Sequence, residues 1–207
     1  MDDWLDWFRE RRGTLILSAL LGLGGIWWWQ GRPLSHPAGL LAPAEPLQTA
    51  PESEATWTYR NHKIAPLARF EIRARVLSTE RYRFDRAADL SPVDFALGWG
   101  PMSDSRVLEA VTIQQRDRWY FWSASQLPIP AGEITTHSAN MHLIPANALV
   151  EKLLLAAKPG QIVELRGKLI RADGLDGWHW VSSLTRTDTG DGSCEVVWVD
   201  SASVTDH

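Results

Sequence analysis

The chain of 207 residues carries a net charge of −4, and 44% of its residues are hydrophobic, with 12 tryptophans and a single cysteine, Cys194. So small a charge argues against nucleic-acid binding, which relies on a basic surface. One cysteine excludes an intramolecular disulfide, and the length suits one domain core of about 150 residues behind an N-terminal segment.

The N-terminal region contains an uncharged run, Thr14–Trp29, that ends in three tryptophans. At about 1.5 Å of rise per residue, a helix of this length covers roughly 25 Å, near the short end of the membrane-spanning range. Arginines at positions 9, 11 and 12 precede the run, and aromatic residues flank it on both sides, as is typical of a span that begins in the cytoplasm. The pattern predicts a cytoplasmic amphipathic stub over residues 1–12, a transmembrane helix over residues 13–30, and a periplasmic location for the remainder.

The rival interpretation of this run is a cleaved signal peptide, whose apolar core is typically about 7–15 residues long. A cleavage site needs small residues, whereas Trp27–Trp29 closes the run and the nearest Ala-x-Ala lies at Ala42–Ala44. An uncleaved anchor is therefore favoured. Ser18 and Gly22 form a small-xxx-small pair, which would permit self-association through the transmembrane helix.

The segment that follows the predicted span, residues 31–56, contains five prolines among Ala, Gly, Ser and Glu residues. Proline at this density removes backbone donors and favours an extended, solvated chain. The sequence therefore predicts a Pro-rich linker over residues 31–56, a periplasmic β domain over residues 57–200, and a disordered tail over residues 201–207.

The clearest strand in the domain lies over residues 69–77, where Phe70, Ile72, Ala74 and Val76 alternate with charged side chains. A period of two is typical of a half-buried strand. Two apolar runs within residues 107–123 predict a hairpin whose second arm is the aromatic block over residues 119–122. Residues 79–105 and 123–144 show no such period and are expected to be irregular.

The C-terminal half contains one helix pattern, because apolar residues recur at 3–4 spacing over residues 146–157, behind Pro145 and before Lys158-Pro159-Gly160. Three strands are expected after it, over residues 161–171, 178–184 and 194–199. This order predicts a mainly β (α+β) domain. It suits a small OB-like antiparallel barrel with one helix between its third and fourth strands. An open antiparallel sheet with the helix on one face is the rival architecture.

Candidate catalytic residues lie in the polar loops, which are natural places for a site on a β scaffold. They are His137, Asn140 and His142 in one loop and Arg186 and Asp188 in another. Gathered in one cleft around His142 and Asp188, they would suit a hydrolase-like envelope enzyme. The sequence has no nucleophile elbow or third orienting residue for such chemistry, so a binding function is favoured over an enzyme.

Metal and cofactor motifs are missing from the sequence. There is no HxxxH or CxxC spacing, and residues 188–192 depart from a calcium loop because Gly190 replaces a ligand. No GxGxxG or phosphate-binding loop is present either. The sequence predicts neither a metal nor a cofactor.

Candidate binding residues come from the aromatic and polar side chains near the loops, because exposed tryptophans suit protein hot spots and glycan stacking. They are Trp99, Asp104, Trp119 and Trp178. The leading hypothesis is a membrane-anchored scaffold or binding module that docks another envelope protein. An envelope enzyme and a cell-wall glycan-binding module are the alternatives.

Four segments carry a family resemblance: GWGPMSD at residues 98–104, RWYFW at 118–122, HSANMHLIPA at 137–146 and SSLTRTDTGDGSCE at 182–195. They resemble an uncharacterised family of bacterial membrane-anchored proteins over roughly residues 69–200. The resemblance implies a bacterial protein with a single membrane span. It assigns no activity and no site residue.

Overall fold

The structure is a computed structural model that describes residues 16–18 and 32–207. Residues 34–207 form one compact unit. The predicted stub, residues 1–12, and nearly all of the predicted span, residues 13–30, lie outside the described residues, while residues 16–18 are helical. In the part of the chain that is described, no helix is long and apolar enough to cross a membrane.

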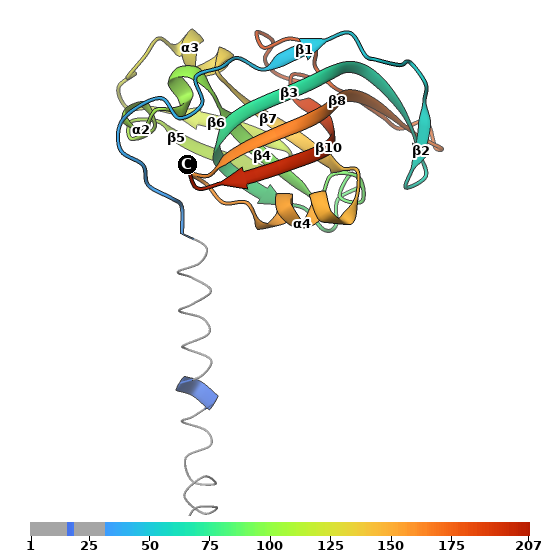
Figure 1. The fold of residues 1–207 in the computed structure, drawn as a ribbon, viewed down its shortest axis with the longest axis horizontal. Helices are drawn as coiled ribbons and strands as arrows, with labels where there is room; N and C mark the ends of the chain where they lie inside the picture. Colours follow the sequence, from blue (N-terminus) through green and yellow to red (C-terminus); the bar gives the residue numbers. More distant parts are fainter. Residues whose placement is uncertain (1–15, 19–31) are drawn as a thin grey trace, which may run out of the picture. The chain divides into compact units, whose positions relative to one another are not determined.

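The compact unit is mainly β, with a large mixed sheet and few helices (Figure 1). In chain order its elements are β1 (Leu47–Thr49), β2 (Trp57–Tyr59), β3 (His62–Arg81), β4 (Val93–Gly98), the 3-10 helix η1 (Gly100–Ser103), α2 (Ser105–Leu108), β5 (Thr112–Arg116), β6 (Trp119–Ser123), α3 (Ala131–Thr136), β7 (Ser138–Pro145), α4 (Ala148–Ala156), β8 (Ile162–Gly174), β9 (His179–Val181) and β10 (Glu195–Thr205).

Five strands of the large sheet pair in a closed ring. Its order is β3-β4-β7-β10-β8, and β8 pairs again with β3. Figure 1 shows β3, β8 and β10 running side by side. All pairs in the ring are antiparallel except β7 with β10, which is parallel. Strand β1 adds to β3 outside the ring, and β9 adds to β8.

The length of β3 allows it to pair on both sides. Residues 62–75 pair with β8, and residues 75–81 pair with β4. Its buried face carries Phe70 and Ile72, as the alternation predicts, so this strand is confirmed. Arg75, which falls on the charged side of the pattern, is instead buried and donates to Ser105 Oγ at 2.9 Å. The alternation between buried and more exposed residues therefore ends at Arg75, and the C-terminal part of the strand is less amphipathic.

Two ring strands, β4 and β7, fall in the stretches predicted to be irregular. All six residues of β4 are buried, and β7 is buried at every position but Ala139. A strand covered on both faces shows no period of two. Polar residues at Asp94, Asn140 and His142 also interrupt the apolar run, which explains why the prediction over residues 79–105 and 123–144 was wrong.

The predicted hairpin is confirmed, but it is not part of the ring. Strands β5 and β6 pair with each other in a separate two-stranded sheet. The two-residue turn consists of Asp117 (φ 55°) and Arg118 (φ 69°). Both central residues have positive φ, as a type I′ hairpin turn requires.

The predicted helix is confirmed as α4, which joins β7 to β8. Asn147 begins it, because its side chain accepts from Leu149 N and Val150 N at 3.0 Å each. Val150 and Leu154 face inward and belong to the same core as Phe70. The helix thus covers part of the core of the ring.

The predicted linker, residues 31–56, does not stand apart from the domain. Leu34 N donates to Pro159 O at 2.9 Å, Ala42 is 1% exposed, and β1 pairs with β3. Gly160, at φ +94°, leaves room for this crossing, since an added Cβ would lie 2.2 Å from Leu34 O. At the other end, β10 continues to Thr205, so most of the predicted tail is strand.

Candidate functional site

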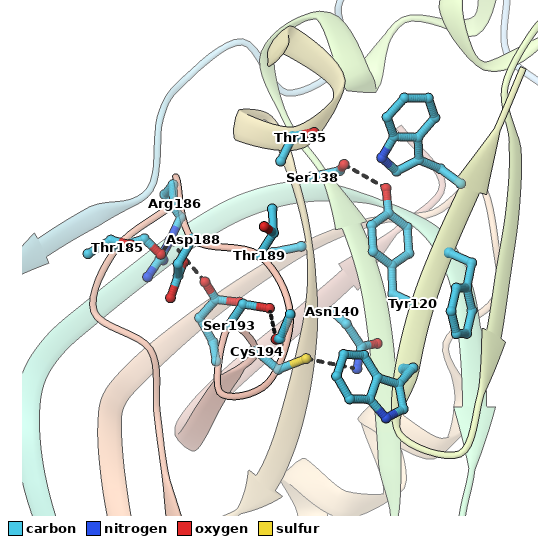
Figure 2. Close-up of a pocket in the computed structure, with 16 residues that line it drawn as sticks. Tyr120, Thr135, Ser138, Asn140, Thr185, Arg186, Asp188, Thr189, Ser193 and Cys194 are labelled. Carbon is cyan, nitrogen blue, oxygen red and sulfur yellow. Dashed lines mark hydrogen bonds and ion pairs between the residues drawn. The ribbon is translucent and has the colours of Figure 1, made fainter. Parts of the chain in front are cut away.

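A pocket of about 290 Å³ lies between the hairpin, β7 and the segment that precedes β10. Figure 2 shows Tyr120 on one side and Arg186, Asp188 and Thr189 facing it across the pocket. The lining residues come from three stretches of chain that are far apart in sequence: Trp119, Tyr120, Phe121, Trp122; Thr135, Ser138, Ala139, Asn140; and Thr185, Arg186, Asp188, Thr189, Gly190, Ser193, Cys194, Glu195.

The aromatic wall of the pocket is formed by four consecutive residues of β6. Trp119 and Phe121 lie on the outer face of the hairpin and are 39% and 44% exposed. Tyr120 and Trp122 lie on the inner face and are partly buried. Side chains alternate between the faces of a strand, so residues of both faces can line one pocket when it runs along the strand's edge.

The polar residues of β7 in this pocket hold the hairpin in place. Ser138 Oγ donates to Ile134 O at 2.6 Å and lies 2.7 Å from the Tyr120 hydroxyl. Asn140 accepts from Gln115 Nε2 at 2.6 Å and donates to Arg118 O at 3.0 Å. Burial raises the pKa of Tyr120 to about 12, so its hydroxyl stays protonated. These groups are hydrogen-bonded within the fold.

A buried ion pair lies at the opposite wall. Arg186 Nε is 2.9 Å from Glu195 Oε1, and Glu195 is 1% exposed. Burial raises the pKa of Glu195 to about 8, although the Arg186 charge opposes the shift. The second carboxylate oxygen, Oε2, has no hydrogen-bond partner among the described residues. Glu195 therefore keeps unused capacity to accept a hydrogen bond.

The remaining residues of this wall are tied to their own loop or are unreactive. Asp188 Oδ2 accepts from Ser183 Oγ at 2.7 Å. Asn140 Nδ2 lies 3.9 Å from Cys194 Sγ. Burial raises the pKa of Cys194 to about 12, so its thiol is protonated near neutral pH. Neither residue is arranged as an activated nucleophile.

His142 belongs to a different, buried network. Its Nδ1 lies 2.8 Å from Asp94 Oδ2, although the angles do not make a hydrogen bond. Arg118 donates to Asp94 Oδ1 at 2.8 Å and to both oxygens of Asp85 at 2.9 Å. Its guanidinium also lies 3.6 Å from the centre of the Tyr82 ring. The network holds the turn of the hairpin against β4 and β7.

A second cavity of about 470 Å³ adjoins this network. It shares Trp119, Gly190 and Cys194 with the first pocket. Its other lining residues are Ala87, Arg118, His142, Trp178, His179, Trp180, Val181 and Gly192. The two cavities therefore border each other beside Trp119.

The five candidate catalytic residues are not gathered in one cleft. Asn140, Arg186 and Asp188 line the first pocket, and His142 lines the second cavity. His137 lies at the end of α3, with Nε2 3.1 Å from Glu45 Oε1 and Nδ1 3.2 Å from Glu133 Oε2.

The four candidate binding residues are not gathered at one site either. Trp119 lines both cavities and Trp178 lines the second. Trp99 is fully buried and donates from Nε1 to Glu45 Oε2 at 2.7 Å, so it belongs to the core. Asp104 begins α2 and also accepts from Gly39 N at 2.9 Å. Trp99 and Asp104 are therefore structural.

Sequence reasoning missed Phe121, Tyr120 and Glu195 as members of the pocket wall. The aromatic block was visible, but its place beside β7 depends on long-range pairing. Glu195 had one local signal, a charge at the start of the apolar run CEVVWV. A buried acid in such a run needs a charged or hydrogen-bonding partner, and the Arg186 guanidinium is that partner.

Among the residues described, no group of three or more His, Cys, Asp and Glu side chains is placed to hold a metal ion. Comparison of the chain with family models, with curated proteins and with solved structures finds no match.

Proposed function

We propose that this chain is a binding module that docks a segment of another protein at the pocket beside β6, on an OB-like barrel. Support for that barrel comes from the ring order, from the single parallel pair β7–β10, and from α4 between the third and fourth ring strands. OB-folds bind ligands over strands two and three and over the loop between strands four and five. Here β7 is the third strand, and residues 185–194 belong to that loop.

The observation that carries the proposal is the contrast between the two kinds of side chain in the pocket. Ser138, Asn140 and Asp188 are hydrogen-bonded within the fold. Trp119 and Phe121 remain exposed at the pocket, although large aromatic side chains favour burial. Exposed aromatic residues beside a concave site are typical of protein-docking surfaces.

An enzyme has less support. His142 and Asp188 line separate cavities, and Cys194 has a protonated thiol. A general base must lie within hydrogen-bonding reach of the group that it activates. No such pair joins His142 to Cys194 or Ser138 among the described contacts.

We infer that residues 13–30 anchor this module in the bacterial inner membrane, with the N-terminus in the cytoplasm and the domain in the periplasm. The arginines at positions 9, 11 and 12 and the tryptophans at positions 27–29 support this orientation. An alkaline phosphatase fused after His207 should be active, because that reporter folds only outside the cytoplasm. An inactive phosphatase fusion together with a fluorescent cytoplasmic reporter at the same position would overturn the orientation.

Photocrosslinking in intact membranes tests the docking surface. A benzophenone side chain in place of Phe121 should give a discrete adduct with one other protein, identified by mass spectrometry. The matched control replaces Leu149, which is 68% exposed on α4 and lies outside the pocket. Adducts at Leu149 but not at Phe121, or no protein adduct at either position, would contradict the proposal. A glycan adduct at Phe121 would replace it with glycan binding.

A further inference from the structure

The edge of β6 that borders the pocket exposes backbone groups that no strand pairs. In a hairpin closed by a two-residue turn, the flanking residues Arg116 and Trp119 exchange hydrogen bonds, and every second pair repeats this. Phe121 and Ser123 therefore also bond to β5. Tyr120 and Trp122 lie between them, so their N–H and C=O groups point away from β5.

These outward groups have no partner in the described chain. Strand β6 pairs with β5 alone, and no backbone or side-chain hydrogen bond within residues 32–207 uses the amide or carbonyl of Tyr120 or Trp122. Since side chains of both faces of β6 line the 290 Å³ pocket, the pocket runs along this same edge. An open strand edge is a template for another strand.

The opposite wall of the pocket indicates which side chain fits. Glu195 is 1% exposed and its Oε2 lacks a hydrogen-bond partner, while its Oε1 pairs with Arg186. Asp188 adds a second acid to the same wall. Burial raises the pKa of Glu195 to about 8, and an ammonium group beside its carboxyl would favour the ionised form. Aromatic rings on the facing wall favour a cation and its apolar stem. A lysine side chain meets these conditions.

We propose that the pocket edge of β6 accepts an extended segment of a partner protein as an added strand, with a lysine of that segment placed between the aromatic wall and Glu195. This inference rests on the proposed docking function and specifies how the partner binds. The segment's backbone bonds to Tyr120 and Trp122, as in other cases of strand addition. The edge presents amide donors and carbonyl acceptors at the spacing of a β-strand. A glycan has no regular array of backbone amides that could pair with them.

The test uses the full chain in detergent and a synthetic peptide that is not itself crosslinked. The peptide has the sequence of the partner segment that crosslinking at position 121 identifies. Trp122→Pro removes the outward N–H while leaving the β5 ladder intact, and Trp122→Ala removes the same side chain but keeps that N–H. We expect Trp122→Pro to weaken peptide affinity at least tenfold relative to Trp122→Ala. Thermal unfolding of both variants establishes that each is folded.

The lysine contact has its own measurement. We expect Glu195→Gln, and separately replacement of the peptide's lysine by norleucine, to lower affinity about tenfold. Combining the two changes should cost little more than either alone, because both remove the same contact. Glu109→Gln makes the same change at an exposed acid outside the pocket and should leave affinity within about twofold.

The outcomes separate this inference from the proposed function. Equal affinities of Trp122→Pro and Trp122→Ala for the peptide would overturn strand addition and leave protein docking in place. A crosslinked segment without lysine, or one from a second copy of this chain, would overturn the assigned partner. Failure to obtain any protein adduct at Phe121 would instead remove the proposed function itself.

Discussion

Of the two residues in the hairpin turn, Arg118 makes the hydrogen bonds that join the hairpin to the ring. It donates to Asp94, Asp85 and the carbonyl of Ser91, and its own amide donates to the Tyr82 hydroxyl at 3.0 Å. Asp94 is completely buried, and Arg118 is its guanidinium partner. Arg118 therefore helps to fix the position of β6, and with it one wall of the pocket, together with the hydrogen bonds of Ser138 and Asn140.

Arg118→Leu should lower the free energy of unfolding by about 3–5 kcal/mol, because it removes the guanidinium partner of the buried Asp94 carboxylate. Arg116→Leu is the matched control. Its side chain is 77% exposed, and the change should stay within about 0.5 kcal/mol. Denaturant unfolding measures both, and equal effects of the two substitutions would contradict this role for Arg118.

Glu195 should make stability depend on pH. Its pKa is about 8 in the folded chain and close to 4.5 when it is exposed. The folded state therefore binds more protons between these values, and stability falls as pH rises from about 4.5 to 8. The loss is at most on the order of 5 kcal/mol, at about 1.4 kcal/mol per pKa unit.

Glu195→Gln should flatten this part of the stability profile, since glutamine does not titrate. Urea unfolding at a series of pH values between 5 and 8 measures the difference between the two proteins. Parallel profiles for the original chain and the variant would show that Glu195 is not the titrating group.

At the scale of elements, the ring depends on close backbone contact between β8 and β10. At Gly167, an added Cβ would lie 1.8 Å from Trp198 O. The register of β8 with β10 shifts between Val199 and Ser201, next to this contact. Glycine is needed here because the two backbones approach too closely for any side chain.

Gly167→Ala should destabilise the domain by about 2 kcal/mol or more, because the strands must separate to admit the methyl group. Gly132→Ala serves as the control. Gly132 lies in α3 with no atom within 4 Å of the added Cβ, so alanine there should be neutral or stabilising by up to about 1 kcal/mol. A similar melting temperature for both variants would contradict the contact at Gly167.

The elements that the sequence predicted best are those with a single covered face. β3, the β5–β6 hairpin and α4 each bury one side, so their periods of two or of 3–4 are visible. β4 and β7 are buried on both faces and carry buried polar residues on the face opposite the main core, where only tertiary partners explain them. The prediction therefore counted the hairpin as the second and third strands of the barrel, whereas β4 and β7 are the second and third strands of the ring.

The site was predictable only in part for the same reason. The loop residues Arg186 and Asp188 were identified because polar loops on a β scaffold commonly carry function. The pairing of Arg186 with Glu195, and the approach of β6 to β7, join residues that are distant in sequence. Pattern alone could not show that His137 and His142 do not line the first pocket.

At the scale of the molecule, the proline-rich stretch over residues 34–56, here called the strap, packs against the rest of the domain. Beyond Leu34 and Ala42, its Glu45 reaches Trp99 and His137, and β1 extends the sheet. The boundary of the folded unit therefore lies at Leu34, well before residue 57. The density of proline reflects an extended path along the surface.

Truncation tests this boundary. A fragment of residues 34–207 should unfold cooperatively. A fragment of residues 57–207 should lose about 3 kcal/mol, or roughly 6–12 °C in Tm, because it lacks several hydrogen bonds of about 1 kcal/mol each. Identical melting temperatures for the two fragments would show that the strap contributes nothing to stability.

The proposed strand addition requires that β6 presents an unpaired edge, which the partner segment covers. Residue-resolved amide hydrogen exchange of the full chain in detergent, with and without the crosslinked partner peptide, tests it most directly. In the free chain, the amides of Phe121 and Ser123 should exchange slowly and those of Tyr120 and Trp122 rapidly, and the peptide should slow the latter two at least tenfold. Slow exchange at Tyr120 and Trp122 before the peptide is added, or no change after it, would rule out strand addition at β6.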